Sequence, residues 1–279
     1  MSKIPEWANN VYYSSSTNMK EVPDNSVELI VTSPPYFNIK DYNEGTDKSF
    51  KTKKKRNDVG SINSIKKYLD KMDKIWTECQ RVLKPNGKLV INVPLMPMIK
   101  ASYSTHYNRD ILDLQSMIQE RVLGIGKMHL MDLYIWNRTN STKKLMFGSY
   151  PYPNNFYNNN IVEFMSVYVK DGKPEKINKK IKEASKLTKQ EWLDYTKQIW
   201  EIPIPNKSDK AFGKHPAIMP EEIVRRFIKM FSFVEGIVLD PFTGSGTTLK
   251  VAKELGRNYI GYELYKENYK DIIEEKLNE

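Results

Sequence analysis

The sequence predicts an α/β protein with a largely parallel, twisted sheet and helices on both faces. Short apolar runs rich in β-branched residues alternate along the chain with longer segments of helical periodicity, which is the rhythm of strand–helix–strand units. The chain has 279 residues, 39% of them apolar, which is enough to bury a sizeable core. No run of about 18 apolar residues occurs, so no membrane span is expected.

The first half of the chain contains one such unit. Residues 27–32 (VELIVT) form an apolar run between turn-forming residues, which predicts a buried strand. Residues 62–83 place apolar side chains at intervals of three or four and predict one or two helices, ended by the KPNG segment at residues 84–87. Residues 88–93 (KLVINV) predict the next buried strand.

The middle of the chain is less regular. Residues 111–123 predict a helix, and residues 131–136 and 161–169 predict strands. Residues 150–160 are rich in Pro, Asn and Tyr and predict a loop. Residues 170–202 are rich in lysine with scattered apolar positions, which indicates a small helical insertion.

The end of the chain contains a second block of alternating elements. Residues 220–231 predict an amphipathic helix with proline at its start and acidic residues in its first turn. Residues 237–240 and 258–263 predict strands, whereas residues 247–255 and 266–277 predict helices.

Charge and cysteine content restrict the class of protein. Forty-four Lys and Arg against thirty-four Asp and Glu give a net charge of +10, which attracts polyanions such as nucleic acid, although a soluble protein can also simply be basic. The single cysteine, Cys79, excludes an intramolecular disulfide framework and a multi-cysteine zinc site, and no metal is expected. Because the first residues lack the apolar core of a signal peptide, we expect a cytoplasmic location.

The first candidate site is the segment DPFTGSGTT at residues 240–248. A predicted strand runs into a loop with two glycines, Gly244 and Gly246, and then a helix whose first N–H groups can face a ligand. Glu263 ends the next predicted strand, where a carboxylate suits ribose hydroxyls. The pattern predicts a nucleoside-containing cofactor, although a lone GxG also occurs in ordinary strand-to-helix turns.

Two common nucleotide motifs are excluded at this loop. No GK[ST] follows it, so it is not a Walker phosphate loop. Leu249 occupies the last glycine position of the dinucleotide fingerprint, which disfavours hydride transfer.

The second candidate site is the segment TSPPY at residues 32–36, at the carboxyl end of the first predicted strand. Ligands of open α/β sheets bind at that edge. The prolines stiffen the turn while their carbonyls remain acceptors, and the Ser33 hydroxyl with an exposed Tyr36 ring would complete a pocket for a flat group that carries an amine. The same residues would also suit a strand-ending turn with a packed tyrosine.

Together, these segments resemble those of the amino-methylating DNA methyltransferases, which use S-adenosylmethionine. TSPPY is similar to the family's catalytic motif, DPFTGSGTT to its cofactor loop, and GYEL at residues 261–264 to its ribose-binding strand. KHPA at residues 214–217 resembles the segment beside the cofactor's methionine end. The catalytic motif precedes the cofactor loop, as in the permuted β class of the family.

The resemblance covers residues 24–170 and 212–275. It implies a Rossmann-like methyltransferase fold with permuted motif order, formed as one catalytic domain over residues 1–279. Residues 170–212 match nothing in the family and are expected to be a target-recognition insertion within that domain.

The resemblance also assigns roles to individual residues. The catalytic positions are Ser33, Pro34, Pro35 and Tyr36. The expected cofactor-binding residues are Thr32, His215, Asp240, Phe242, Thr243, Gly244, Ser245, Gly246, Thr247 and Glu263. Phosphate contacts with DNA are expected from Lys51, Lys53, Lys54, Lys55 and Arg56, although such a run can also be a solvated loop.

The family chemistry identifies the expected target. Hydrogen bonds from the base amine to the Ser33 hydroxyl and the Pro34 carbonyl would localise the nitrogen lone pair for attack on the sulfonium methyl, after the base has flipped out of the duplex. Serine at this position goes most often with N4 of cytosine, and Asp or Asn with N6 of adenine, so N4-cytosine is expected and N6-adenine is the alternative. Cys79 lies in a predicted helix in step with Trp76, which indicates core packing and not a cytosine-C5 nucleophile.

Double-stranded DNA is therefore the expected partner. A restriction–modification system with a separately acting endonuclease fits the family, and both a monomer and a homodimer fit the sequence. Two other readings stay open: a basic nucleic-acid-binding module that binds no cofactor, and methylation of RNA or of a protein glutamine, for which NPPY is the usual motif.

Overall fold

An eight-stranded sheet forms the middle layer of the computed structural model, which describes residues 4–37, 64–98, 110–141, 149–215 and 217–279. In spatial order its strands are β1 (Asn10–Tyr12), β10 (Asn258–Tyr262), β9 (Ile237–Asp240), β2 (Val27–Thr32), β3 (Leu83–Pro94), β7 (Val162–Lys170), β6 (Met128–Asn137) and β8 (Ile199–Glu201). All neighbouring pairs of this sheet are parallel except those that β7 makes with β3 and β6. The predicted α/β class with a largely parallel sheet is confirmed.

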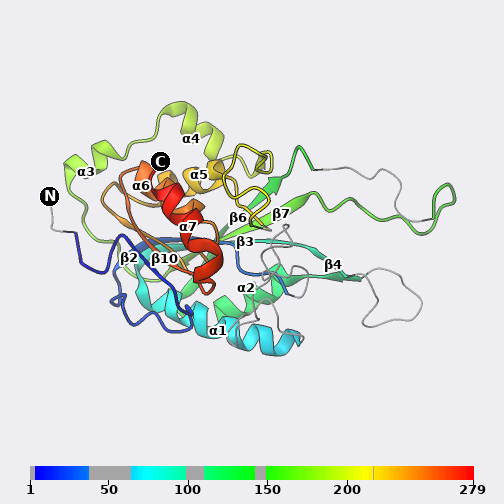
Figure 1. Cartoon of the computed structure of the whole chain (residues 1–279), viewed down its shortest axis with the longest axis horizontal. Coiled ribbons are helices and arrows are strands. Elements are labelled where there is room, and N and C mark those ends of the chain that lie inside the picture. The colour runs from blue at the N-terminus through cyan, green and yellow to red at the C-terminus, as the bar shows by residue number, and fades with distance from the viewer. Residues whose placement is uncertain (1–3, 38–63, 99–109, 142–148, 216) are drawn as a thin grey trace.

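Helices cover both faces of the sheet (Figure 1). The helices are α1 (Ile65–Val82), α2 (Leu114–Gly124), α3 (Lys179–Ala184), α4 (Lys189–Tyr195), α5 (Glu221–Phe231), α6 (Thr247–Glu254) and α7 (Lys266–Leu277). Helices α1 and α2 lie on one face, and α5, α6 and α7 lie on the other. Among the described residues no helix is long and apolar enough to span a membrane.

The apolar strand β2 explains this layering. Successive side chains of a strand point to opposite faces: Ile30 joins the core cluster that contains Trp76 and Cys79 of α1, whereas Leu29 and Val31 join the cluster that contains α5. A strand buried on both faces must be apolar throughout, which is why VELIVT reads as a continuous run. Cys79 is fully buried in the first cluster, so its predicted core position is confirmed.

Between β2 and β9 the direction in which successive strands are added to the sheet reverses. The chain leaves β2 through α1 and enters β3 on one side, and it leaves β9 through α6 and enters β10 on the other side. Ligands of open α/β sheets bind at such a switch point, beyond the carboxyl ends of the strands. The pairing of Ile30 with Leu239 places the TSPPY segment after β2 directly beside the DPFTGSGTT segment after β9.

Several element boundaries differ from the prediction. The KPNG segment belongs to β3, which starts at Leu83 directly after α1, and a register shift against β2 accommodates it. Helix α2 starts at Leu114 because the preceding residues pair in a small sheet of β4 (Met96–Met98) and β5 (Asp110–Leu112). The three-residue strands β1 and β8 were not predicted.

The predicted insertion at residues 170–212 does not form one unit. Lys170 ends β7, and its buried ammonium donates to the carbonyls of Gln80 at 2.6 Å and Leu83 at 2.7 Å, so it is a structural residue and no part of a surface basic cluster. Residues 174–175, 177 and 185–187 line a cavity with Lys84 and Lys88, at the amino ends of β2 and β3. This part of the insertion therefore lies at the edge of the sheet opposite to the switch point.

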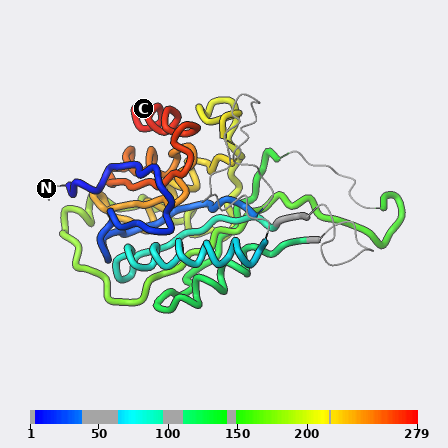
Figure 2. Tube along the Cα trace, turned by 60° about the horizontal axis from the view of Figure 1, so that its bottom comes forward, coloured from blue at the N-terminus to red at the C-terminus, as the bar shows by residue number. Residues whose placement is uncertain are grey.

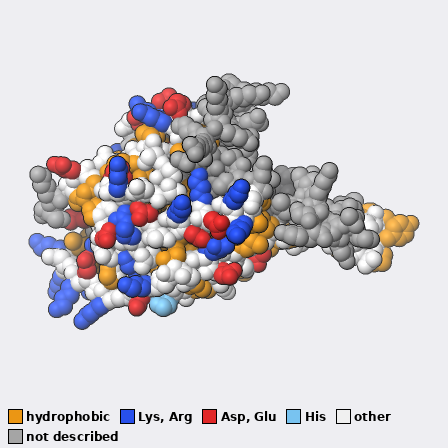
Figure 3. Space-filling view, turned by 90° about the horizontal axis from the view of Figure 1, so that it is seen from below, with side chains coloured by type: hydrophobic (Ala, Val, Ile, Leu, Met, Phe, Trp, Pro, Cys, Tyr) orange, Lys and Arg blue, Asp and Glu red, His pale blue; other side chains and the backbone are white. Residues whose placement is uncertain are grey.

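The hairpin of β6 and β7 extends beyond the body of the molecule as an arm (Figures 1 and 2). Residues 150–160 near its far end lie outside the helices and longer strands, as predicted. Hydrophobic side chains gather at that end, while charges of both signs mix over the body (Figure 3). The exposed hydrophobic residues of this segment are Tyr150, Tyr152 and Phe156.

Candidate active site

Asp240, at the end of β9, joins the two predicted site segments. One carboxylate oxygen accepts hydrogen bonds from Thr32 Oγ1 at 2.7 Å and from the Phe242 N–H at 3.0 Å, and the other accepts from Thr248 Oγ1 at 2.8 Å. Burial raises the pKa of Asp240 to about 6, against these hydrogen bonds, which lower it. The carboxylate therefore fixes the end of β2, the loop after β9 and the first turn of α6 relative to one another.

Glu263, directly after β10, holds the same loop from the other side. One carboxylate oxygen accepts from the Gly244 N–H at 2.8 Å, and the other accepts from the Tyr265 N–H at 2.8 Å. Burial raises the pKa of Glu263 to about 7; the two N–H donors lower it, and the nearby Asp240 raises it further. Two buried carboxyl groups thus face one region, which favours a positively charged ligand there.

At Gly244 the loop after β9 lies close to the segment that contains His215. The φ of Gly244 is +52°, and a Cβ at this position would lie 2.6 Å from Nε2 of His215. The Nδ1 atom of His215 accepts the N–H of Ala217 at 3.1 Å, so Nε2 carries the proton of the neutral ring. The structure therefore places His215 beside the glycine loop, and its expected position near the methionine end of the cofactor stays a prediction.

A cavity lies at the carboxyl ends of β2, β9 and β10, between these groups. The predicted site residues that line it are Ser33, Pro35, His215, Asp240, Phe242, Thr243, Gly244, Ser245, Thr247 and Glu263. No sequence signal indicated the contribution of residues 14–16, which follow the unpredicted strand β1, or of Tyr265 and Tyr269.

Four predicted catalytic or cofactor-binding residues, Thr32, Pro34, Tyr36 and Gly246, do not line this cavity, and of these Tyr36 lines the adjoining one. Thr32 is fully buried and donates to Asp240 instead. Gly246 has a φ of +84° and faces α7, because a Cβ there would lie 3.3 Å from Cγ1 of Ile273. Pro34 is buried and lines neither this cavity nor the next one.

A second cavity, of about 420 Å³, adjoins the first one. The two share Ser33, His215, Ala217 and Met219 in their walls. The further wall of the second cavity includes Trp136 and residues 204–205 and 212–213, so the last part of the predicted insertion does reach the site. Ser33 therefore stands where a ligand of one cavity would meet a ligand of the other.

Tyr36 differs from the prediction of an exposed ring. Its side chain is buried, with 6% of the residue exposed. The phenol oxygen lies 3.0 Å from Ser33 Oγ and donates to the Glu163 carboxylate at 3.2 Å. A buried phenol needs such partners, and they place the hydroxyl, and not the open face of the ring, at the cavity wall.

Glu163 of β7 and Asn92 of β3 form a buried polar pair in the second cavity that the sequence reading missed. The Asn92 amide donates to the Glu163 carboxylate at 2.6 Å, and Nη1 of Arg138 lies 3.2 Å from its other oxygen. The sequence does indicate that these two residues are unusual, because each places a polar side chain within a largely apolar predicted strand, KLVINV or IVEFMSVYV. Buried polar groups in strands cost free energy unless they are paired, and they often mark function.

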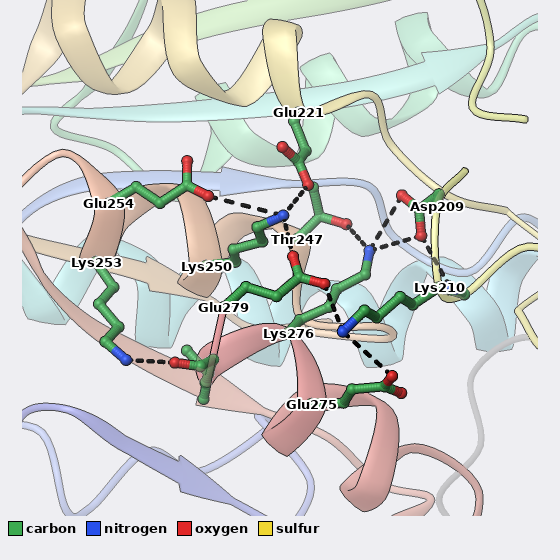
Figure 4. A network of polar contacts seen from close by, with 12 residues as sticks. Asp209, Lys210, Glu221, Thr247, Lys250, Lys253, Glu254, Glu275, Lys276 and Glu279 are labelled. Atoms are coloured by element: carbon green, nitrogen blue, oxygen red, sulfur yellow. Dashed lines mark hydrogen bonds and ion pairs between the residues drawn. The ribbon is translucent and has the colours of Figure 1, made fainter.

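An ionic network fastens the segment before His215 to the last helix (Figure 4). The ammonium of Lys276, of which 2% is exposed, lies 3.0 Å from the Asp209 carboxylate and donates to Thr247 Oγ1 at 3.1 Å. Beside it, Lys210 pairs with the last residue, Glu279, at 2.8 Å. The network thereby ties residues 209–215 to the start of α6, at the floor of the first cavity.

The predicted DNA-contacting run Lys51–Arg56 lies outside the described residues, so its expected phosphate contacts stay a prediction. Within the described part of the chain, no group of three or more metal-binding side chains comes together.

The chain resembles known proteins in sequence and in fold. The model of a DNA methylase family, covering N6 and N4 methyltransferases, matches residues 27–275. The chain is similar to the type II methyltransferase M.MjaI of Methanocaldococcus jannaschii, with 34% identity over 96% of this chain and 90% of the relative. The TTHA0409 protein of Thermus thermophilus, solved with S-adenosyl-L-methionine, matches with a TM-score of 0.74 and 27% identity over 96% of this chain and 93% of that one. The cytosine-N4-specific PvuII DNA methyltransferase shares the fold, with a TM-score of 0.66 and 18% identity over 96% of this chain and 92% of that one.

Proposed function

The chain belongs to the DNA methylase family of N6 and N4 methyltransferases, and from that premise we propose that it methylates N4 of cytosine in duplex DNA. S-adenosylmethionine is the methyl donor of this family. One observation carries the proposal: Ser33 stands at the junction of two cavities, one formed by the glycine loop and one by polar side chains of the central strands. Two ligands bound in these cavities would meet at the residue that the family uses for catalysis.

The residues of the first cavity fit the cofactor. The carboxylate of Glu263 would accept hydrogen bonds from the ribose hydroxyls, and the negative charges of Glu263 and Asp240 would favour a cation. The absence of a side chain at Gly244 leaves room beside His215 that a Cβ would fill. When bound, S-adenosylmethionine supplies an electrophilic methyl group on a positively charged sulfur.

The chain's part in the reaction is to position the amine. The exocyclic amine of a base is a weak nucleophile, because its lone pair is delocalised into the ring. Ser33 Oγ donates to the Asn92 carbonyl at 3.3 Å and lies 3.0 Å from the Tyr36 oxygen, and in this fixed position it would accept a hydrogen bond from that amine. A fixed acceptor favours a tetrahedral nitrogen, and holding the amine in line with the methyl group can supply ~7–11 kcal/mol of the barrier reduction.

Cytosine is proposed as the base because position 33 is a serine and not the Asp or Asn that is more frequent in N6-adenine enzymes of the family. The relatives named as type II methyltransferases also support sequence-specific methylation in a restriction–modification system. An endonuclease of that system would act as a separate protein. The cytoplasm, where the DNA is found, is the proposed location.

Product analysis tests the proposal. The protein is incubated with labelled S-adenosylmethionine and mixed-sequence duplex DNA, the DNA is digested to nucleosides, and the label is located by mass spectrometry. Label in N4-methylcytosine is expected, and sequencing of the methylated DNA then gives the target sequence. Label in N6-methyladenine would show that the target base is adenine and not cytosine. Label in 5-methylcytosine would refute the amine mechanism, and label in RNA alone would refute DNA as the substrate.

A further inference from the structure

The second cavity contains a polar cluster in which the Asn92 amide and Arg138 have no role in the proposed methyl-transfer step. Glu163 is its centre, with 6% of the residue exposed. Its carboxylate accepts hydrogen bonds from the Asn92 amide and the Tyr36 hydroxyl and lies 3.2 Å from Nη1 of Arg138. Glu163 is thus engaged by three partners, and its evident effect is to fix the orientation of the other groups.

Asn92, a residue of the second cavity's wall, has an acceptor without a hydrogen-bond partner among the described residues. Because its Nδ2 donates to a carboxylate at 2.6 Å, the amide cannot be flipped, and the oxygen Oδ1 must point the other way. This oxygen is buried and receives no hydrogen bond from any of the described residues. An unpaired buried acceptor costs about 1–3 kcal/mol, a cost that a ligand with an N–H group would remove.

Arg138 presents unused donors to the same cavity. Its Nε donates to the Ile161 carbonyl at 3.1 Å, its Nη2 to the Asn160 carbonyl, and its Nη1 faces Glu163. A guanidinium has five N–H groups, so these three partners in the described part of the chain leave two N–H groups for a ligand. The side chain is 25% exposed and lines the cavity.

We propose that Asn92 and Arg138 read the hydrogen-bonding edge of the flipped target base, an inference that rests on the proposed function. The exocyclic amine would donate to Oδ1 of Asn92 as well as to Ser33, and Arg138 would donate to the ring carbonyl at the other end of the same edge. Cytosine carries such a carbonyl, O2, next to the acceptor N3. Adenine carries a C–H group there and would leave the guanidinium donors unpaired in a partly buried site.

This arrangement assigns different roles to the three residues. Asn92 and Arg138 are specificity-determining residues that contact the base, whereas Glu163 is a positioning residue that orients both. The cavity of about 420 Å³ lies within the range of 300–1,000 Å³ that is typical of small-ligand sites. The indole ring of Trp136 supplies part of an apolar wall for a flat ring.

The test uses Arg138→Met and two duplexes that carry the mapped target sequence, one with cytosine and one with adenine at the target position. For the wild type, kcat/KM is expected to be higher on cytosine. The variant is expected to lose about tenfold or more on cytosine and little on adenine, because only cytosine loses a partner. Arg121→Met is the matched control, since Arg121 pairs with Asp73 at 2.8 Å and lines neither cavity.

A third duplex, with an abasic target site, separates base reading from folding and from phosphate binding. Arg138→Met should bind this duplex with wild-type affinity and bind the cytosine duplex less tightly. Equal losses on both duplexes would overturn the proposal, because they would make Arg138 a backbone or structural contact. Glu163→Gln should show a smaller form of the same selective loss, while S-adenosylmethionine binding stays normal.

The two proposals fail in different ways. N6-methyladenine as the wild-type product would refute the proposed function and the reading of O2 together. N4-methylcytosine with an unchanged base preference in Arg138→Met would leave the proposed function intact and refute the role of Arg138 alone.

Discussion

The carboxylate of Glu263 accepts a hydrogen bond from the backbone N–H of Gly244 across 2.8 Å. This contact joins the end of β10 to the loop after β9. In the sequence, helix α6 lies between these two segments. The contact keeps an ionisable group buried at the wall of the first cavity, where burial raises the pKa of Glu263 to about 7. The protonation of the site therefore changes near neutral pH.

The first prediction is that cofactor affinity rises with pH. Ribose hydroxyls and a cationic sulfur favour the carboxylate of Glu263 over the carboxylic acid, so binding lowers its pKa. Below about pH 7 binding must release a proton, and the affinity should fall by up to about tenfold per pH unit; above pH 7 it should level off. Calorimetry between about pH 6 and about pH 8 measures this, and Glu263→Gln should bind more weakly, with any remaining fall in affinity confined to the region near pH 6, where Asp240 takes up a proton. An affinity that falls as pH rises would contradict the assignment.

The second prediction concerns Gly244. In Gly244→Leu the new Cβ would lie 2.6 Å from His215 Nε2, and the φ of +52° is unfavourable for a side chain. S-adenosylmethionine binding should be abolished in a protein that keeps its fold by circular dichroism. Gly124→Leu is the control, because a Cβ at Gly124 meets no atom within 4 Å. Unchanged affinity in folded Gly244→Leu would remove the glycine loop from the cofactor site.

The sequence predicted the elements of the sheet that are governed by local patterns. Strands β2, β3, β7, β9 and β10 are apolar runs buried on both faces, and their existence follows from composition alone. The strands β1 and β8 have three residues each, too few to show a period, and they exist because neighbouring strands offer free edges. The order of the strands depends on the same long-range pairing, so it could not be read from any segment.

The positions of site residues were predictable where those residues belong to a sequence motif. Asp240, Gly244 and Glu263 come together at one edge as their motifs indicate, whereas Gly246 lies outside the lining of the cavity and packs against α7, so its expected role in cofactor binding stays a prediction. The burial of Tyr36 follows from Glu163, which lies 127 positions away in the sequence. A hydrogen bond between such distant residues is a product of the fold, and no spacing rule anticipates it.

The third prediction concerns the basic run at residues 51–56. If these side chains neutralise phosphates, Gln at Lys51, Lys53, Lys54, Lys55 and Arg56 should weaken binding to all duplexes alike. The slope of log K against log salt should fall by about 0.9 per lost contact. The matched control replaces lysines of α3, which lies beside the cavity at the amino ends of the strands. An unchanged slope in the first variant would make the run a solvated loop.

The fourth prediction concerns the buried ion pair of Lys276 and Asp209, 3.0 Å apart. Lys276→Met leaves the Asp209 carboxylate without its partner and should lower the free energy of unfolding by about 3–5 kcal/mol. Because Lys276 also donates to Thr247 Oγ1 in the wall of the first cavity, S-adenosylmethionine should bind more weakly. Denaturant unfolding and calorimetry measure the two effects. The double variant Lys276→Met with Asp209→Leu should recover most of the stability, and equal stability of all three proteins would show that the pair is not coupled.

The last prediction concerns Ser33, whose oxygen lies where the two cavities meet. In Ser33→Ala the base amine loses a fixed acceptor, while the walls of the cofactor cavity keep their other residues. A contact that acts on the transition state more than on the ground state lowers kcat with little change in binding, so methyl transfer should slow by on the order of 100-fold while cofactor affinity stays within about twofold. Ser166→Ala is the matched control, because Ser166 is a buried serine of β7 that lines neither cavity. Single-turnover kinetics with saturating DNA separates the chemical step from product release. A normal single-turnover rate in Ser33→Ala would show that the hydroxyl does not hold the amine, whichever base is methylated.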